Sequence, residues 1–460
     1  MARSNRSIDV PRARPLLAML AAGVLVVAGC STAATASPAA TAAATSAPTS
    51  AATQAASAEA TASAAASAPA SASAAASLAA ACPLPAGTGP IVIGVSQALT
   101  GDKSDPGTAI QHGYQVWAKE VNDAGGLLGR QVKFKTYDNQ SLADTAVSQM
   151  ERLATVDKVD LMFGPFSSAL TIPTEAVANK YGYAFIEGAG GSPQVFQRNF
   201  DNVFFVQPAT ADHQADPFVQ YILSLPADQR PASAAYPQQD DPFVSATEDG
   251  AQKALEAAGI KTAYKDVYPP TQTDFASIAA AVKASGADIV LGGTIGSDSM
   301  AQTQAYSAIN YQPKAVYYTS GPSTVGPFKQ ALGAKVAGIY SGDGWIQSSK
   351  APGNDKFVTE YHAMFPKEQD IGTESAEGYS VGQVLQAAVT ATSCLDNKTI
   401  SDWLHANKVQ TIQGLIGWDA VGRPNGSYLL EQYQNGELHV VAPAGDPNKD
   451  ADPQYPKPNW

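Results

Sequence analysis

Val159–Thr171 reads VDLMFGPFSSALT, which is an apolar run, a Gly-Pro turn and then two serines. The run predicts a buried strand, and the serines predict the start of a helix. The first turn of a helix has free backbone N–H groups and the positive end of the helix dipole, which together favour a bound anion. Ser167 and Ser168 are also good N-cap residues, so a hydroxyl that only caps its own helix is an equally good interpretation.

Strand-then-helix patterns repeat on both sides of this stretch, from Ile91–Val95 to Ala315–Tyr318. Repeated units of this kind form parallel-type sheets with helices on both faces, and about ten units exceed one comfortable sheet. We therefore expect an α/β protein with two lobes. Ligands of such sheets bind outside the carboxyl ends of the strands, so the loops that leave the strands are the candidate binding loops.

The N-terminus has the layout of a secretory signal peptide over residues 1–29, with a basic start and an apolar run, Leu16–Ala28. Its ending, Val27-Ala28-Gly29-Cys30, resembles the bacterial lipobox. That resemblance implies cleavage before Cys30 and a lipid on its sulfur, which would anchor the protein at the outer face of the cell membrane. A plain secretory signal followed by a chance cysteine is the alternative.

Residues 30–85 are almost wholly Ala, Ser, Thr and Pro, and they lack the large apolar side chains that a core needs. We expect a disordered linker between the lipid anchor and the folded body. If Cys30 is lipidated, Cys82 and Cys394 remain, and two leftover cysteines in an exported protein predict one disulfide. Two unpaired thiols are the alternative.

Charge and motif content exclude several classes of function. The chain carries 29 basic and 41 acidic residues, the wrong balance for a nucleic-acid-binding protein. The five histidines show no metal-ligand spacing, and no phosphate-binding loop occurs, so we expect neither a metal nor a cofactor. Ser168 has no identifiable histidine base and no G-x-S-x-G elbow occurs, so we do not expect an enzyme.

Several longer motifs carry a family resemblance. They are IVIGVSQALTGDKSDPG (91–107), EVNDAGGLLGRQVKFKTYDNQ (120–140), the opening stretch, YPPTQTDFASIAAAVKASGADIVLGG (268–293) and GLIGWDAVGRPNGSYLLEQYQNGEL (414–438). Together they resemble the branched-chain amino-acid-type substrate-binding proteins of ABC transporters, which have the type I periplasmic-binding fold. The resemblance implies two lobes joined by a three-segment hinge. The first would comprise 89–209 and 342–417, the second 210–341 and 418–442, and 443–460, rich in Pro and Asp, would be a loose tail.

The resemblance also implies ligand-binding residues in the first lobe. Ser168 matches the serine that holds the ligand carboxylate in the family, and Ser167 lies beside it. Ala189 matches a small residue of the next loop. Gly191 stands where the family has a threonine, so the neighbouring Ser192 is the candidate replacement for its hydroxyl.

The second lobe departs further from the family. One aromatic position of the family falls near Gln239 or Asp240, and another falls near Thr294 or Ile295. The acid that holds the ligand ammonium falls near Gly321, where there is no carboxylate. Asp240 or Asp241 could replace it from another loop. A buried ammonium without a counter-charge costs several kcal/mol, so these departures disfavour a simple leucine-type ligand.

The sequence thus predicts a lipid-anchored solute receptor that captures a small polar or carboxylated molecule and delivers it to ABC permease subunits. Amino-acid-like compounds, amides and aromatic acids are the expected ligand classes. A sensory receptor of the same fold, signalling to a membrane partner, is the alternative function.

Overall fold

The structure is a computed structural model that describes residues 89–460. The predicted signal peptide (1–29), the lipidation site Cys30, the linker (30–85) and Cys82 lie outside the described residues. Cys394 is fully buried and disulfide-bonded. Its pairing with Cys82 stays a prediction.

The first lobe contains a five-stranded sheet in the order β2-β1-β3-β4-β5, and every pairing is parallel. All but one of its strands are largely apolar and buried, which is typical of a sheet that is covered on both faces. The exception is the edge strand Val132–Asp138, which contains two lysines and is partly exposed. The strands are β1 (Ile91–Gln97), β2 (Val132–Asp138), β3 (Leu161–Phe163), β4 (Phe185–Glu187) and β5 (Val203–Phe205).

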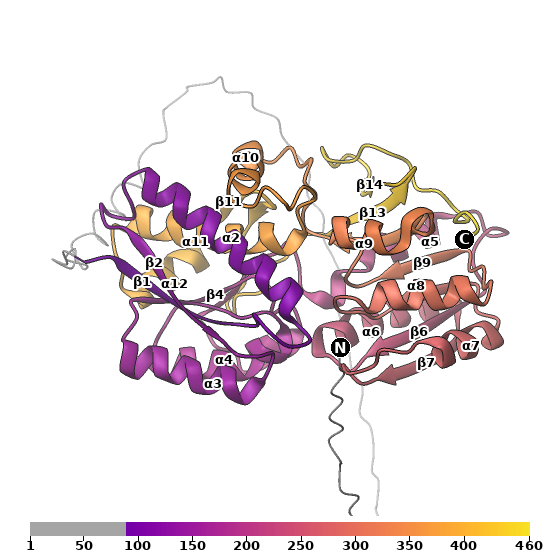
Figure 1. The fold of residues 1–460 in the computed structure, drawn as a ribbon, viewed down its shortest axis with the longest axis horizontal. Coiled ribbons are helices and arrows are strands. Elements are labelled where there is room, and N and C mark those ends of the chain that lie inside the picture. The colour runs from indigo at the N-terminus through magenta and orange to yellow at the C-terminus, as the bar shows by residue number, and fades with distance from the viewer. Residues whose placement is uncertain (1–88) are drawn as a thin grey trace, which may run out of the picture. The chain divides into compact units, whose positions relative to one another are not determined.

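Helices cover both faces of this sheet. One face packs against α2 and α11, and the other packs against α3 and α4. The helix α11 comes from late in the chain, so gold and indigo segments lie in one lobe in Figure 1. The helices are α2 (Ser104–Asp123), α3 (Ala143–Arg152), η1 (Leu153–Asp157), α4 (Ser168–Tyr181), η2 (Pro193–Phe196), α10 (Asn354–Met364), α11 (Thr373–Thr392) and α12 (Asn397–Ala406).

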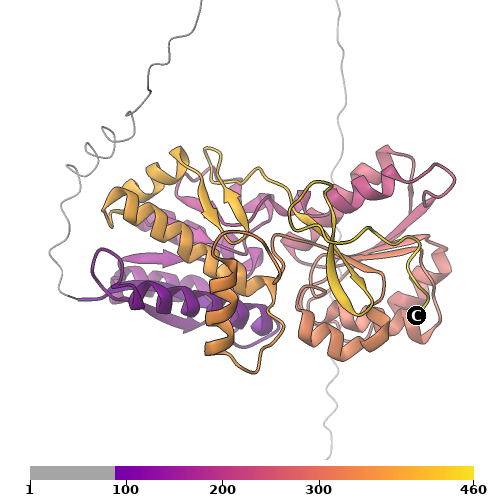
Figure 2. The same cartoon turned by 90° about the horizontal axis from the view of Figure 1, so that it is seen from above.

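The second lobe contains a seven-stranded sheet in the order β14-β13-β10-β9-β8-β6-β7. The strands β6 to β10 pair in parallel, whereas β13 and β14 form an antiparallel hairpin added at one edge, seen as the yellow strands in Figure 2. The strands are β6 (Ser233–Gln239), β7 (Lys261–Tyr268), β8 (Ile289–Gly292), β9 (Ala315–Tyr318), β10 (Ile339–Asp343), β13 (Leu429–Gln434) and β14 (Glu437–Ala442).

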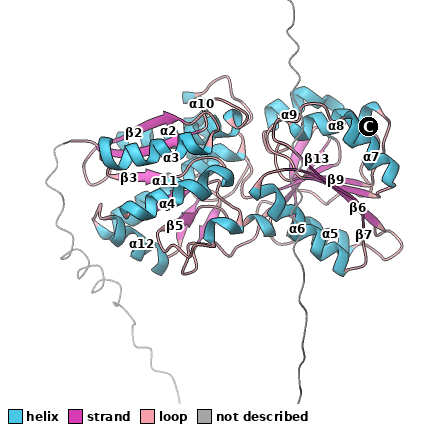
Figure 3. Cartoon of the chain, turned by 90° about the horizontal axis from the view of Figure 1, so that it is seen from below, coloured by secondary structure: helices cyan, strands magenta, loops and turns pink. Residues whose placement is uncertain are grey.

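Figure 3 shows α7, α8 and α9 on one face of the second sheet and α5 and α6 on the other. Between the two lobes the chain passes three times: after β5, after β10 and after a small two-stranded sheet. The remaining elements are η3 (Ala211–His213), α5 (Asp216–Ser224), α6 (Pro242–Ala257), α7 (Ala276–Ser285), α8 (Asp298–Ala308), α9 (Val325–Leu332), η4 (Gly333–Val336), β11 (Val409–Thr411) and β12 (Gly414–Ile416). The two-lobed α/β fold with helices on both faces is confirmed.

The prediction of a loose tail over 443–460 was wrong. The tail packs on the second lobe, where Tyr340 donates from its hydroxyl to the carbonyl of Gln454 at 2.7 Å. The backbone N–H of Lys457 donates to the carbonyl of Lys314 at 2.8 Å, and the indole of Trp460 donates to the carbonyl of Tyr311. Polar, proline-rich composition did not reveal these backbone partners, which lie far away in the sequence.

Within residues 89–460 no helix combines the length and the apolar character that crossing a membrane requires.

Candidate functional site

A cavity of about 40 Å³ lies where loops leave the carboxyl ends of strands in both sheets. This is the position at which open α/β sheets bind ligands. The first lobe contributes Phe166, Ser167, Ala189, Gln207, Thr373, Glu374 and Glu377 to its lining; the second contributes Gln214, Phe243, Ile295, Thr319, Ser320, Ser323 and Asp343.

Ser167 lines the cavity directly before the start of α4. The strand β3 ends at Phe163, and α4 begins at Ser168, as the pattern predicted. The Ser167 side chain makes no capping hydrogen bond to its helix, and its Oγ is buried with no hydrogen-bond partner within residues 89–460. The capping interpretation is therefore wrong for Ser167, and its hydroxyl is available to a molecule in the cavity.

Ser168, by contrast, is used inside the lobe. Its Oγ accepts a hydrogen bond from the backbone N–H of Ser192 at 3.0 Å, which ties the start of α4 to the loop after β4. The Ser192 hydroxyl in turn accepts from the backbone N–H of Gln194 at 3.3 Å. Neither serine lines the cavity, so both support its wall from behind.

The loop after β4 supplies one lining residue and one close approach. Ala189 lines the cavity. At Gly191 an added Cβ would lie 2.9 Å from the ring of Phe205 and 3.1 Å from the ring of Phe243, which is too close for a larger residue. Because Phe243 belongs to the second lobe, Gly191 permits the two lobes to approach each other here.

The residues predicted in the second lobe do not line the cavity. Asp240 is exposed, and Asp241 caps α6 by accepting from the backbone N–H of Phe243 at 2.8 Å. Thr294 donates from its hydroxyl to the carbonyl of Ser320 at 2.7 Å, which joins the loops after β8 and β9. Its neighbour Ile295 is the residue of this loop that reaches the cavity.

Three buried carboxyl groups that the sequence did not identify line the cavity. Asp343 ends β10, and its Oδ1 accepts from the backbone N–H of Gly344 at 2.8 Å and from the Thr373 hydroxyl at 2.7 Å. Burial raises the pKa of Asp343 to about 6. Glu374 and Glu377, the other two, lie in the first turns of α11, three residues apart and so on one face of the helix.

The environments of these two glutamates differ in detail. Glu377 accepts from the side-chain amide of Gln207 at 2.5 Å, whereas Oε2 of Glu374 has no hydrogen-bond partner within residues 89–460. Burial and the nearby Asp343 raise the pKa of Glu374 to about 7. Burial and the charge of Glu374 raise the pKa of Glu377 well above its usual range. None of the described residues that line the cavity is Lys, Arg or His.

A weak signal for these glutamates existed in the sequence. Acidic residues in the first turn of a helix usually complement the helix dipole at the surface. After its first turn, however, α11 is mostly small and apolar, and residues on every side of it are buried. Charged residues in such a helix must face a polar cavity or a partner.

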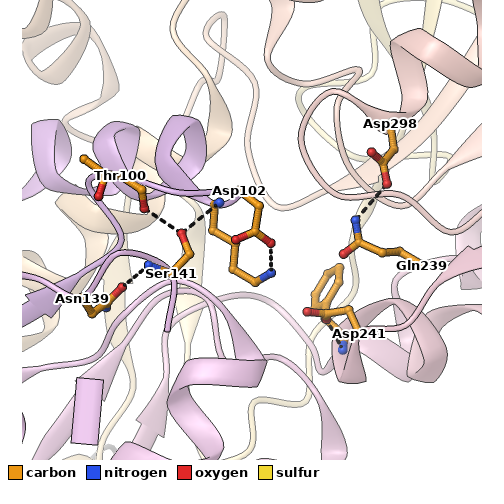
Figure 4. A network of polar contacts seen from close by, with 9 residues as sticks. Thr100, Asp102, Asn139, Ser141, Gln239, Asp241 and Asp298 are labelled. Atoms are coloured by element: carbon orange, nitrogen blue, oxygen red, sulfur yellow. Dashed lines mark hydrogen bonds and ion pairs between the residues drawn. The ribbon is translucent and has the colours of Figure 1, made fainter. Parts of the chain in front are cut away.

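A second group of charges lies at the rim between the lobes. Figure 4 shows Asp102, with Thr100 and Ser141, on the first lobe and Gln239, Asp241 and Asp298 on the second. Lys103 is buried and pairs with Asp102 at 2.9 Å.

The Lys103 ammonium also acts on the carboxyl groups of the facing lobe. Burial raises the pKa of Asp298 to about 6 and also raises that of Asp241, and in both cases the charge of Lys103 opposes the shift. A lysine of one lobe is therefore placed to attract two aspartates of the other. Within residues 89–460 no group of three His, Cys, Asp or Glu side chains is arranged to hold a metal ion.

Comparisons with known proteins agree with this architecture. The family model described as periplasmic binding protein matches residues 90–437. Leu/Ile/Val-binding protein homolog 7 of Brucella melitensis is 24% identical over 367 residues, which cover 75% of this chain and 88% of that protein.

Two solved structures share the fold. A solute-binding protein of an ABC transporter from R. palustris, solved in complex with benzoate, has a TM-score of 0.69 at 18% identity, with 78% of this chain and 99% of that chain covered. The branched-chain amino acid transporter substrate-binding protein LivJ from Streptococcus pneumoniae, solved with isoleucine, has a TM-score of 0.67 at 20% identity, with coverage of 76% and 98%.

Proposed function

The chain belongs to the periplasmic binding protein family, of the Leu/Ile/Val-binding-like type, and we propose that it is an extracytoplasmic receptor for a small carboxylate-bearing, amino-acid-like solute. The solute would bind in the cavity between the lobes and be delivered to an ABC importer. The observation that carries this proposal is the Ser167 hydroxyl, which is buried, lines the cavity and has no hydrogen-bond partner within the described residues.

The start of α4 suits the carboxylate end of such a solute. A helix of 14 residues begins at Ser168. The backbone N–H groups of Leu170 and Thr171 donate to the carbonyl of Ser167, which leaves those of the first two helical residues without partners within the helix. The helix dipole favours negative charge at this end, and a serine hydroxyl can donate one hydrogen bond to it. An unpartnered buried hydroxyl beside a helix start therefore suits a carboxylate group.

Buried amides beside the lobe crossings would keep the cavity in shape. Gln214 donates to the carbonyls of Thr319 at 2.9 Å and Gly342 at 2.8 Å, and Gln207 donates to the carbonyl of Gly188 at 2.7 Å. Because these bonds hold the lining loops, closure of the lobes around a solute would be a hinge motion between preformed walls. Ligand binding would then favour the closed form that a permease recognises.

The proposal includes the N-terminal predictions. Residues 1–29 would direct export, and Cys30 would carry the lipid that keeps the receptor at the outer face of the membrane. A Cys30→Ser variant should be released from the membrane fraction in soluble form. Retention of this variant in the membrane would contradict lipid anchoring without affecting the solute-binding proposal.

Solute binding is tested on the full chain by thermal shift with a panel of amino acids, amides and aromatic acids, because a bound ligand raises stability by mass action. We expect at least one carboxylate-bearing compound to raise the Tm. Ser167→Ala should weaken its binding about tenfold, the effect of losing a hydrogen bond to a charged group. The matched control is Ser277→Ala, at an exposed position of α7. If no compound binds, or Ser167→Ala binds all hits unchanged, the proposal fails.

A further inference from the structure

The cavity holds an excess of buried acidic groups that the described protein does not neutralise. Asp343, Glu374 and Glu377 are 6%, 4% and 5% exposed, and no described cationic side chain lines the cavity with them. A carboxylate that is buried without a positive partner is strongly destabilised, so such groups either take up a proton or meet a cation.

Two other buried glutamates of this chain can be compared with Glu374. Glu175 is fully buried and pairs with Arg198 at 2.7 Å, and Glu187 accepts backbone N–H groups of Ala189, at 2.8 Å, and Gly190. Both are held by partners within their own lobe. One oxygen of each, Oε2 of Glu175 and Oε1 of Glu187, is nevertheless buried without a hydrogen-bond partner within residues 89–460, as is Oε2 of Glu374. Glu374 differs from these two because it lines the cavity.

A second, independent observation points to a bound molecule in the same cavity. The Ser167 hydroxyl is 2% exposed and without a partner among the described residues, and it lines the cavity together with Glu374 and Glu377. One cavity thus presents a hydroxyl at a helix start, suited to an anion, and a group of carboxyls suited to a cation. Only a solute that carries both kinds of charge would satisfy both.

We propose that Asp343, Glu374 and Glu377 form a cation subsite, so that the cavity selects carboxylate-bearing solutes with an ammonium or guanidinium group over carboxylates that lack one. This inference rests on the proposed function, because it takes the cavity as the solute site. It replaces the acid missing near Gly321 with groups from α11 and from the end of β10.

The placement of the subsite couples the cation to both lobes. Glu374 and Glu377 lie on α11 of the first lobe, Asp343 ends a strand of the second sheet, and the Thr373 hydroxyl joins them by donating to Asp343 at 2.7 Å. A cation held here would contact both walls at the point where the chain crosses between them.

A second hollow that shares Glu374 with the cavity is also mainly acidic. Glu374 lines this hollow together with Asp105, Glu368 and Asp370, and Lys367 and His112 are the basic residues among its described lining. A cleft lined mainly by one sign of charge raises the local concentration of solutes of the opposite sign. This second hollow would therefore favour the entry of cations.

The test compares pairs of solutes that differ in one charged group, either the amine or the carboxylate, by calorimetry on the full chain. The probes are L-leucine against 4-methylpentanoate, which lacks the amine, and L-arginine against agmatine, which lacks the carboxylate. We expect each amino acid to bind at least about tenfold more tightly than its partner, since loss of either charge leaves a buried group unpaired.

Variants test which carboxyl groups of the cavity produce the preference for solutes with a cationic group. Glu374→Gln and Glu377→Gln should each weaken binding of the amino acids about tenfold and leave 4-methylpentanoate unchanged or more tightly bound. The matched control is Glu248→Gln, a fully buried glutamate of α6 that does not line the cavity, and it should keep the wild-type preference.

The outcomes separate the two proposals. If 4-methylpentanoate binds as tightly as L-leucine, the cation subsite is overturned while the solute receptor stands. If none of the four probes and no compound of the wider panel binds, both are overturned. If a variant fails to fold, the comparison of L-leucine with 4-methylpentanoate on the wild-type chain still tests the cation subsite.

Discussion

The two walls of the cavity differ in chemistry. The first-lobe wall presents Ser167, Glu374 and Glu377, which can contact charged groups of a solute. The second-lobe wall presents mostly uncharged residues, with Phe243 and Ile295 as its apolar part. The one carboxyl group of the second-lobe wall, that of Asp343, lies where the chain crosses between the lobes. Under the proposed function, the first lobe would therefore recognise most of the charge of a solute and the second lobe would mainly cover it. Changes in the first wall should therefore alter selectivity, whereas changes in the second should alter affinity for all solutes alike.

The largest effect is expected from the double variant Glu374→Gln, Glu377→Gln. It removes two of the three carboxyls that line the cavity, so L-leucine should bind about 100-fold more weakly, at about tenfold for each charge lost. The empty protein should become more stable in urea, because neutral amides are less costly to bury than carboxyls. Unchanged affinity combined with unchanged stability would mean that the first wall does not recognise the cation.

Phe243→Ala tests the second wall. The Phe243 ring lines the cavity and approaches Gly191 of the first lobe, so its loss removes apolar contact between the solute and the covering lobe. We expect about tenfold weaker binding, since burial of part of a phenylalanine contributes roughly 1–2 kcal/mol. Calorimetry should show an equal loss for L-leucine and 4-methylpentanoate. A loss confined to one of them would place charge recognition in the second wall as well.

The pH dependence follows from the raised pKa values of the carboxyl groups that line the cavity. In the empty cavity burial raises the pKa of Asp343 to about 6 and that of Glu374 to about 7. A bound cation favours the ionised carboxyls, so binding releases protons and the affinity for L-leucine should rise at least about tenfold from pH 5.5 to pH 7.5. The same carboxyls ionise more readily in the unfolded chain, with pKa values of about 4.

The stability of the empty protein should therefore change in the opposite direction. The contribution of Asp343 and Glu374 to the free energy of unfolding is fully present below about pH 4. It is lost as the pH rises through about 6 and 7, where the two carboxyl groups ionise in the folded protein. Urea unfolding at a series of pH values should show this fall, and saturating L-leucine should reduce it. A fall of the same size in Glu374→Gln would assign it to other groups.

The smallest effect is expected at the rim. Lys103→Met removes the cation that faces Asp241 and Asp298, so the attraction between the lobes should weaken and affinity should fall about twofold to threefold. The loss should shrink at high salt, which screens such charges. The matched control is Lys119→Met, at an exposed pair with Asp123, which should bind as the wild type does.

The sequence by itself determined the elements and pointed to Ser167 and Ala189, two of the residues that line the candidate site. The strand, turn and helix around Ser167 depend on apolar periodicity and on turn residues, which act over a few neighbouring positions. The same local rules placed the helix start that suits an anion. They also gave the two-lobed fold, because the repetition of such units limits how sheets can be assembled.

Only the tertiary structure decided which side chains reach the cavity. Ser167 and Ser168 are adjacent and chemically alike, and Ser168 is excluded because the distant backbone of Ser192 donates to it. Asp343 and Glu377 meet because the chain crosses between lobes and then returns along α11. Contacts between residues so far apart in the sequence depend on how the sheets and helices pack, and local sequence patterns do not predict that packing.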